Sequence, residues 1–213
     1  IDFGGRYSFM NQGKIMLWNL SKFAESIIPL LSDNIEDAKK IAIECLKEFP
    51  EIFEKNWLRE MRRKIGLTSI QNEDIKIIND FLELIKNENL DFTLSFRNLS
   101  NLINSNSKKK DENNFKDKNN FNEWFLRWNK RLEKEKLEKS KIALEMNKIN
   151  PLYIPRNHLV EDVINAAVNN NDFSKLKELL KVVRKPFAKG DFDKKYSLPP
   201  LPEEIISNTF CGT

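Results

Sequence analysis

The chain has 213 residues, with 36 basic and 32 acidic side chains, a net charge of +4 and a hydrophobic fraction of 40%. This length can bury a core of one to two domains. The balanced charges exclude a basic nucleic-acid stripe, and no apolar run approaches the ~20 residues of a membrane span, so we expect neither nucleic acid nor a membrane as a partner. Two cysteines, Cys45 and Cys211, and one histidine, His158, do not make a structural zinc site.

Helical periodicity dominates the first half of the chain. Apolar residues recur every three or four positions over 15–31, and Pro29 is expected to end or kink that helix. Asn34 is placed to cap a second helix that Pro50 should break before a third begins. Cys45 falls on the apolar face of the second helix and is expected in the core. The pattern predicts two further helices, over 74–85 and 92–103.

A polar low-complexity segment, 105–120, interrupts this pattern. Lys, Asn and Asp dominate it and only Phe115 can anchor it, which predicts a flexible loop. A long helix is predicted over 121–146, and a helical hairpin over 159–183 has its turn at 170–172. The pattern alone predicts an all-α fold. The chain divides into three segments: helices over 1–104, the loop over 105–120, and a helical extension with a Pro-rich tail over 121–213.

Several motifs follow one another along the chain. It opens with Asp2-Phe3-Gly4, the metal-binding tripeptide of protein-kinase folds. Behind it come, in order, Gly5-Arg6-Tyr7-Ser8-Phe9, Trp18-Asn19-Leu20, Lys64-Ile65-Gly66-Leu67, Asp91-Phe92-Thr93 with Phe96-Arg97-x-Leu99-Ser100, Trp124-x-x-x-Trp128-x-x-Arg131-Leu132, Asn150-Pro151-x-Tyr153-x-x-Arg156-Asn157, Arg184-x-Pro186-Phe187 and Phe210-Cys211-Gly212-Thr213. In this order the blocks resemble the selenoprotein O (SelO) family over essentially the whole chain.

The resemblance implies a mainly α fold, the C-terminal lobe portion of a protein-kinase-like fold with family-specific C-terminal helices and without the N-lobe. It also implies a pseudokinase-like protein adenylyltransferase, which moves AMP from ATP to Ser, Thr or Tyr hydroxyls of protein substrates with Mg²⁺ or Mn²⁺. Asp2 is the residue it assigns to the metal and, through the metal, to ATP. The family's catalytic base, second metal ligand and ATP-contacting basic residues lie before residue 1, so we expect no catalytic residue here and no AMP transfer by residues 1–213 alone.

Two departures from the family pattern concern the site. Gly4 runs directly into Gly5 where the family carries an activation loop, and Asn11-Gln12 is followed by Gly13 instead of proline. The resemblance makes Cys211 the candidate redox residue, because this region of the family holds a cysteine or selenocysteine that can pair with an activation-loop cysteine. Without that loop we expect no redox switch within the chain. The tail resembles bacterial members, which favours the cytoplasm; a eukaryotic member would be mitochondrial.

Two other classes stay open. An ordinary protein-kinase C-lobe is disfavoured because Ala-Pro-Glu does not follow Asp-Phe-Gly, and a non-catalytic helical interaction module fits the composition equally well. Other residues are expected to have structural roles. We expect Arg6 and Tyr7 to form an ordinary pairing, Trp18 and Leu20 to lie in the core, and Asn157 to cap a helix. His158 is not expected to act as a base.

Overall fold

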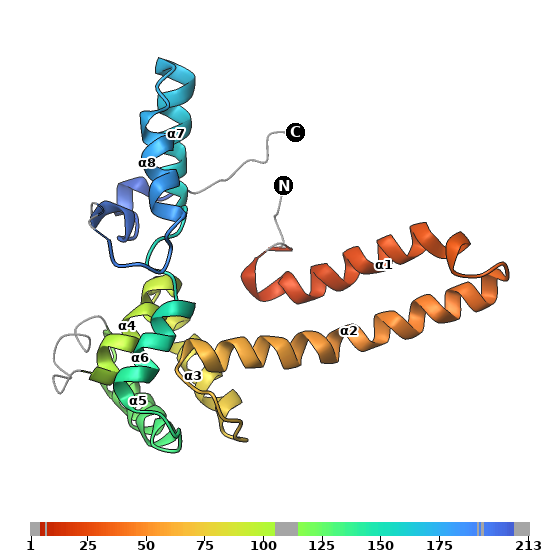
Figure 1. Cartoon of the computed structure of the whole chain (residues 1–213), viewed down its shortest axis with the longest axis horizontal. Helices are drawn as coiled ribbons and strands as arrows, with labels where there is room; N and C mark the ends of the chain where they lie inside the picture. The colour runs from red at the N-terminus through yellow and green to blue at the C-terminus, as the bar shows by residue number, and fades with distance from the viewer. Residues whose placement is uncertain (1–4, 7, 105–114, 191, 193, 207–213) are drawn as a thin grey trace. The chain divides into compact units, whose positions relative to one another are not determined.

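The computed structural model describes residues 5–6, 8–104, 115–190, 192 and 194–206. Within these residues the chain is built from helices without a strand, as predicted (Figure 1). None of the helices in this part of the chain combines the length and the apolar character needed to cross a bilayer. The chain divides into two compact units, with the boundary between Glu60 and Met61.

The first unit contains η1 (Phe9–Asn11), α1 (Gln12–Leu31) and most of α2 (Ile35–Lys64). α1 and α2 run in opposite directions from the turn at 32–34 (Figure 1). Asn34 caps α2 as predicted, because its Oδ1 accepts hydrogen bonds from the backbone N–H groups of Glu36 at 2.9 Å and Asp37 at 3.3 Å.

The predictions that Pro50 breaks a helix and that Trp18 and Cys45 lie in the core were wrong. α2 continues through Pro50, and Pro29 lies inside α1. A helical proline leaves the carbonyl four residues earlier without its N–H partner, and here that residue, Leu46, is not fully buried. The expected core positions also differ, since Trp18 is 47% exposed and Cys45 is exposed. Within this unit each of the two long helices packs on the other alone, and α1 has no buried residue.

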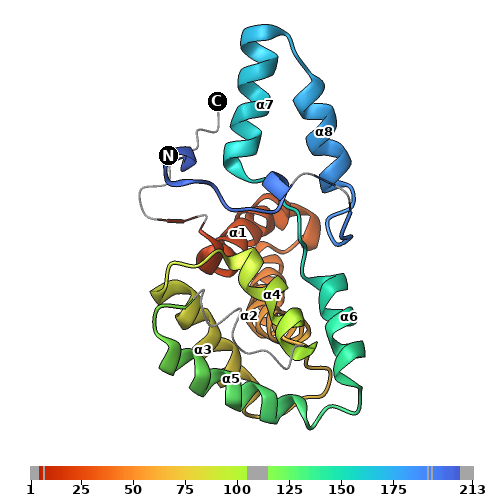
Figure 2. The same cartoon turned by 90° about the vertical axis from the view of Figure 1, so that its left-hand side faces the viewer.

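The second unit holds the remaining helices, which pack in pairs. α3 lies beside α5, α4 beside α6, and α7 beside α8 (Figure 2). Asn171, at the turn of the predicted α7–α8 hairpin, adopts φ +50°, and Asp172 accepts a hydrogen bond from the Ser174 N–H at 2.8 Å. The helices expected over 74–85 and 92–103 are confirmed. The bounds are α3 (Asp74–Asn87), α4 (Phe92–Asn104), α5 (Lys118–Leu132), α6 (Lys139–Ile149), α7 (Asn157–Asn170), α8 (Ser174–Val183), η3 (Lys194–Tyr196) and η4 (Pro202–Glu204).

The long helix predicted over 121–146 is two helices, α5 and α6, separated by residues 133–138. α5 starts earlier than predicted, at Lys118, where the Asp117 carboxylate accepts a hydrogen bond from the Asn120 N–H. Phe115 is the anchor that the sequence indicated, since it is 8% exposed and its ring stacks on Phe121 at 4.1 Å. The rest of the predicted loop, 105–114, lies outside the described residues.

Two tryptophans on α5 form the centre of the second unit. The Trp124 and Trp128 rings stack with centroids 5.3 Å apart, and both side chains are almost completely buried. The Trp124 Nε1–H donates to the backbone carbonyl of Ile77 at 2.9 Å, and the Trp128 Nε1–H donates to that of Ile65 at 2.8 Å. Each indole therefore buries its apolar surface without losing its hydrogen bond, and together they fix α5 against α3 and the end of α2.

Candidate functional site

The two residues that the resemblance assigned to chemistry, Asp2 and Cys211, lie outside the described residues. Their metal and redox roles stay predictions. Elsewhere in the described chain, no group of three or more His, Cys, Asp and Glu side chains is arranged to hold a metal ion. Arg6 has a structural pairing, as interpreted from the sequence, because its guanidinium lies 5.4 Å from the ring centroid of Trp18.

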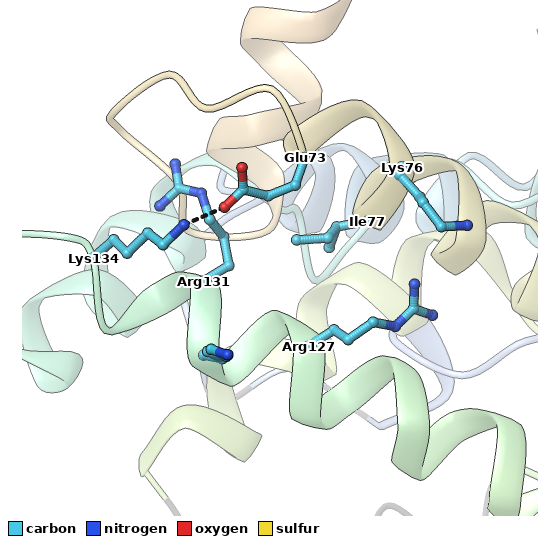
Figure 3. A pocket seen from close by; sticks show the side chains of 7 residues that line it. Glu73, Lys76, Ile77, Arg127, Arg131 and Lys134 are labelled. Carbon is cyan, nitrogen blue, oxygen red and sulfur yellow. Dashed lines mark hydrogen bonds and ion pairs between the residues drawn. The ribbon is translucent and has the colours of Figure 1, made fainter.

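A cleft of about 330 Å³ lies between α3 and α5 in the second unit (Figure 3). Glu73 and Lys134 lie at one end and Lys76 and Arg127 at the other, with Ile77 between them. The helices hold these side chains in place because α3 and α5 are joined beneath them by the buried indoles. The cleft is lined by Glu73, Lys76, Ile77, Arg127, Lys130, Arg131 and Lys134.

The rim of the cleft carries more positive than negative charge. Lys134 pairs with Glu73, which lowers the pKa of that carboxyl group through a direct hydrogen bond. Lys76 and Arg127 both pair with Asp80 on α3. The Lys130 side chain makes no hydrogen bond or ion pair with any other described residue. Four exposed cations thus face two carboxylates, an excess of two positive charges.

The fifth cation of the cleft, Arg131, belongs to a buried ionic network. Its Nε–H donates to Oδ1 of Asp74 at 2.6 Å, and both side chains are at most 1% exposed. Arg62 donates to the other oxygen of Asp74 at 2.8 Å, and so does the Gln71 N–H at 2.9 Å. Burial lowers the pKa of Arg131, but its bonds to Asp74 and Glu135 outweigh this and raise it. Arg131 therefore lines the cleft with a side chain that its hydrogen bonds hold in place, and its charge is balanced by the buried carboxylates of Asp74 and Glu135.

Glu135 completes this network and explains the break between α5 and α6. Its carboxylate accepts hydrogen bonds from the backbone N–H groups of Thr68 and Ser69, from both hydroxyls, and from Arg131 at 2.8 Å. Burial acts to raise the pKa of Glu135, but these donors outweigh it and lower the pKa from 4.5 to about 2. The backbone leaves the helix after Leu132, which brings this carboxylate to the loop that follows α2.

Other residues of the quoted motifs form the joint between α4 and α6. Arg97 Nη1 donates to the backbone carbonyls of Asn147 and Asn150, each at 2.8 Å. The Asn150 side chain donates to the Lys64 carbonyl at 2.7 Å, and Ser100 donates to the side chain of Asn147 at 2.8 Å. The Arg97 and Asn150 side chains thus supply hydrogen bonds to backbone carbonyls at helix ends, and we assign these motif residues to stabilising the fold.

The start of α7 is held by a second arginine. Arg156 takes the N-cap position that was expected of Asn157, which is the first helical residue. The Arg156 guanidinium makes a two-pronged contact with Asp91, and this pairing lowers the pKa of Asp91 against the effect of burial. His158 shows no nucleophile or carboxylate partner, and its Nδ1 is a buried atom without a hydrogen bond among the described residues.

The sequence did not single out Asp74, Glu135 or the cleft. Glu135 sits in a run of alternating charges that is typical of a solvated helix, and its inward position depends on the distant Thr68-Ser69 loop. One local signal was present, because Glu135 follows Arg131 by four residues and this spacing favours an ion pair on a helix. Nothing local distinguishes Asp74 from an ordinary acidic residue in a first helical turn.

Comparison with known proteins gives one family. The family described as "Protein adenylyltransferase SelO" matches residues 1–184. Proteins named "Protein nucleotidyltransferase YdiU" are similar over the whole chain: 40% identical in Nitrosococcus oceani, and 39% identical in Bradyrhizobium diazoefficiens and in Halalkalibacterium halodurans. The chain spans 42%, 43% and 42% of the lengths of these three relatives. On both grounds, the chain belongs to the SelO family of protein nucleotidyltransferases.

Proposed function

We propose that this chain is part of a protein adenylyltransferase that transfers AMP from ATP to Ser, Thr or Tyr hydroxyls of protein substrates. The observation that carries the proposal is the family match over residues 1–184, which extends over most of the chain. Membership supports nucleotidyl transfer to protein in general. The proposal goes beyond family membership in three respects: the transferred group is AMP, the acceptors are hydroxyl groups, and the fold includes a protein-kinase-like lobe.

The reaction that we propose is a displacement at phosphorus. The hydroxyl oxygen of the substrate forms a bond to the α-phosphorus of ATP, the bond to the β-phosphate oxygen breaks, and pyrophosphate leaves. A base takes the hydroxyl proton. Such transfer depends on positioning and on neutralising charge, so the protein has to hold both substrates rigidly.

Asp2 is the residue of this chain that we assign to the site, by its place in Asp2-Phe3-Gly4. Its carboxylate would hold Mg²⁺ or Mn²⁺, since hard divalent cations take oxygen ligands. When bound, the metal would neutralise phosphate charge. The described residues would contribute a scaffold, because the buried network of Asp74, Arg131 and Glu135 fixes three segments of the second unit to one another.

A chimera tests the proposal. Residues 1–213 replace the matched segment of the Nitrosococcus oceani relative, and transfer to protein is followed with ATP labelled at the α- or the γ-phosphate. We expect α-label on protein from the chimera, none from residues 1–213 alone, and none from the Asp2→Asn chimera. Asp33→Asn, which removes an exposed carboxylate of the first unit, should keep full transfer.

Each alternative has its own outcome. Transfer of the γ-label would indicate a protein kinase. No transfer by a chimera whose circular dichroism matches that of the parent relative would favour an interaction module. Preference for labelled UTP, GTP or CTP would keep nucleotidyl transfer and overturn the choice of AMP. Mass spectrometry of the product separates these outcomes by the group added to the acceptor.

A further inference from the structure

We propose that the cleft between α3 and α5 is a docking site for an acidic segment of a protein, one in which an apolar side chain lies between acidic ones. The proposal rests on the proposed function only in identifying that protein as the substrate. The site is distinct from Asp2 in sequence, and it is formed entirely within the second unit.

The spacing of the cations fits an extended segment. Arg127 and Lys130 lie one turn apart on α5, and Lys134 follows two residues after the helix ends, so the three cations line one side of the cleft. The backbone is still αR at Glu133, so the first and the last lie roughly 10 Å apart along the helix direction, given ~1.5 Å per residue. An extended peptide covers this distance with about three residues at ~3.3 Å each. A single small anion would instead need these donors to converge on one point.

Charge on the rim favours carboxylates. The excess of two positive charges lies toward Lys76, Arg127 and Lys130, because Lys134 is matched by Glu73. The Lys76 and Arg127 side chains are 71% and 45% exposed and share one carboxylate, Asp80, which is 22% exposed. Pairs with such exposed cations are weak enough for an incoming carboxylate to bind the cations as well. Lys130 already lacks a partner in the described chain.

The floor and the lining select a peptide over a nucleic acid. Ile77, which is 4% exposed, lies between the two charged ends of the cleft, and together with the aliphatic stems of Lys76 and Arg127 it provides an apolar floor for one side chain (Figure 3). None of the seven lining residues is aromatic, so the cleft lacks the aromatic platform on which single-stranded bases stack. Glu73 and Asp80 would repel a continuous phosphate backbone, while a peptide can place its acidic residues away from them.

The test is binding of a probe peptide to residues 1–213. A fluorescein-labelled Glu-Glu-Leu-Glu-Glu peptide is titrated at low and at physiological salt, and fluorescence anisotropy is followed. Arg127→Glu with Lys130→Glu should weaken binding about tenfold or more, and the neutral pair Arg127→Gln with Lys130→Gln should weaken it less. The matched control, Lys141→Glu with Lys148→Glu on the exposed side of α6, makes the same change in net charge and should leave binding within about twofold.

Several results would overturn the proposal. They are an absence of binding by the unmodified chain, equal weakening by the α5 and α6 pairs, full displacement by pyrophosphate at the peptide's own concentration, or tighter binding of a single-stranded oligonucleotide. Circular dichroism of each variant separates lost binding from lost folding, and the Gln pair keeps the test valid if the Glu pair unfolds. The binding assay contains no nucleotide, so a failure to bind the peptide says nothing against AMP transfer. In the same way, a failure of the chimera to transfer AMP says nothing against peptide binding.

Discussion

The Nε of Arg131 lies 2.6 Å from Oδ1 of Asp74, and neither side chain is more than 1% exposed. Asp74 begins α3 and Arg131 lies in the last turn of α5, so this contact joins two helices that are far apart in the sequence. Removing two charges from water is unfavourable, and the pair is tolerated because Arg62 and Glu135 supply further bonds to its members.

Asp74→Ala should destabilise the second unit strongly. It leaves the Arg131 guanidinium buried with one carboxylate fewer and also removes the partner of Arg62, so we expect a loss of about 3–5 kcal/mol in the free energy of unfolding. Urea denaturation followed by tryptophan fluorescence measures it, because Trp124 and Trp128 are buried in the same unit. Lys134→Ala removes an exposed pair with Glu73 and should leave the free energy of unfolding close to that of the parent. Equal effects of the two variants would contradict the assignment.

Acid should weaken the fold through Glu135. Its pKa of about 2 in the folded protein lies below the ordinary value of 4.5, so the stabilisation is fully present above pH 4.5 and is lost as the pH falls toward 2. The shift corresponds to at most about 3 kcal/mol. Glu135→Gln should be less stable than the parent at pH 7 and should lose much of the pH dependence in this window.

The control for Glu135 is its exposed neighbour. Glu133→Gln removes the same charge from the same segment, and it should keep both the stability at pH 7 and the acid transition of the parent. Equilibrium unfolding from pH 7 to 2 compares the two variants. If both lose the acid transition equally, the local charge of the segment, and not the buried carboxylate, sets the acid stability.

Local patterns predicted much of the secondary structure. The apolar spacing of α3 and α4, the Asn34 cap and the turn at Asn171 depend on neighbours within one or two turns, and the structure confirms them. Pro50 misled the prediction because a proline removes a single hydrogen bond, which a 30-residue helix can accommodate at an exposed position.

The buried network and the cleft were not predictable in the same way. Glu135 reads as one more charge in a solvated run until its Thr68-Ser69 partners, 66 and 67 residues away, are known. Arg131 appeared in a quoted motif, but its partner Asp74 did not. The cleft depends on which side chains of α3 and α5 face each other, and this follows from how two helices pack and not from the spacing within either one.

Gly66 should resist substitution for two independent reasons. It adopts φ +82° where α2 ends, and a Cβ there would lie 2.6 Å from Ile142 and 2.8 Å from the sulfur of Met146. Gly66 and Leu67 donate to the carbonyls of Arg63 and Arg62, the pattern of a helix that ends through a left-handed residue. The left-handed conformation alone costs about 1–2 kcal/mol for alanine, and the steric overlap adds to it.

The measurement for Gly66→Ala is the thermal midpoint, with Asn171→Gly as its counterpart. Asn171 also has a positive φ, at +50°, but it already carries a side chain in an exposed turn. Glycine there should change stability by no more than about 0.5 kcal/mol. A Gly66→Ala variant that melts with the parent would show that the end of α2 can rearrange without loss.

Asn150→Asp should be far more damaging than the same change at Asn147. The Asn150 amide donates to the Lys64 carbonyl at 2.7 Å, and a carboxylate in its place sets two acceptors against each other in a site that is 1% exposed. The Lys64 Nζ, 3.2 Å from the Asn150 Oδ1, offsets this loss only in part. We expect a loss of about 1–3 kcal/mol or more. The side chain of Asn147 accepts from Ser100 and makes no other hydrogen bond in the described structure, and a carboxylate still accepts, so Asn147→Asp should lose less. Urea denaturation of the two variants compares them directly, and a larger loss at Asn147 would show that buried charge, and not the missing donor, dominates this joint.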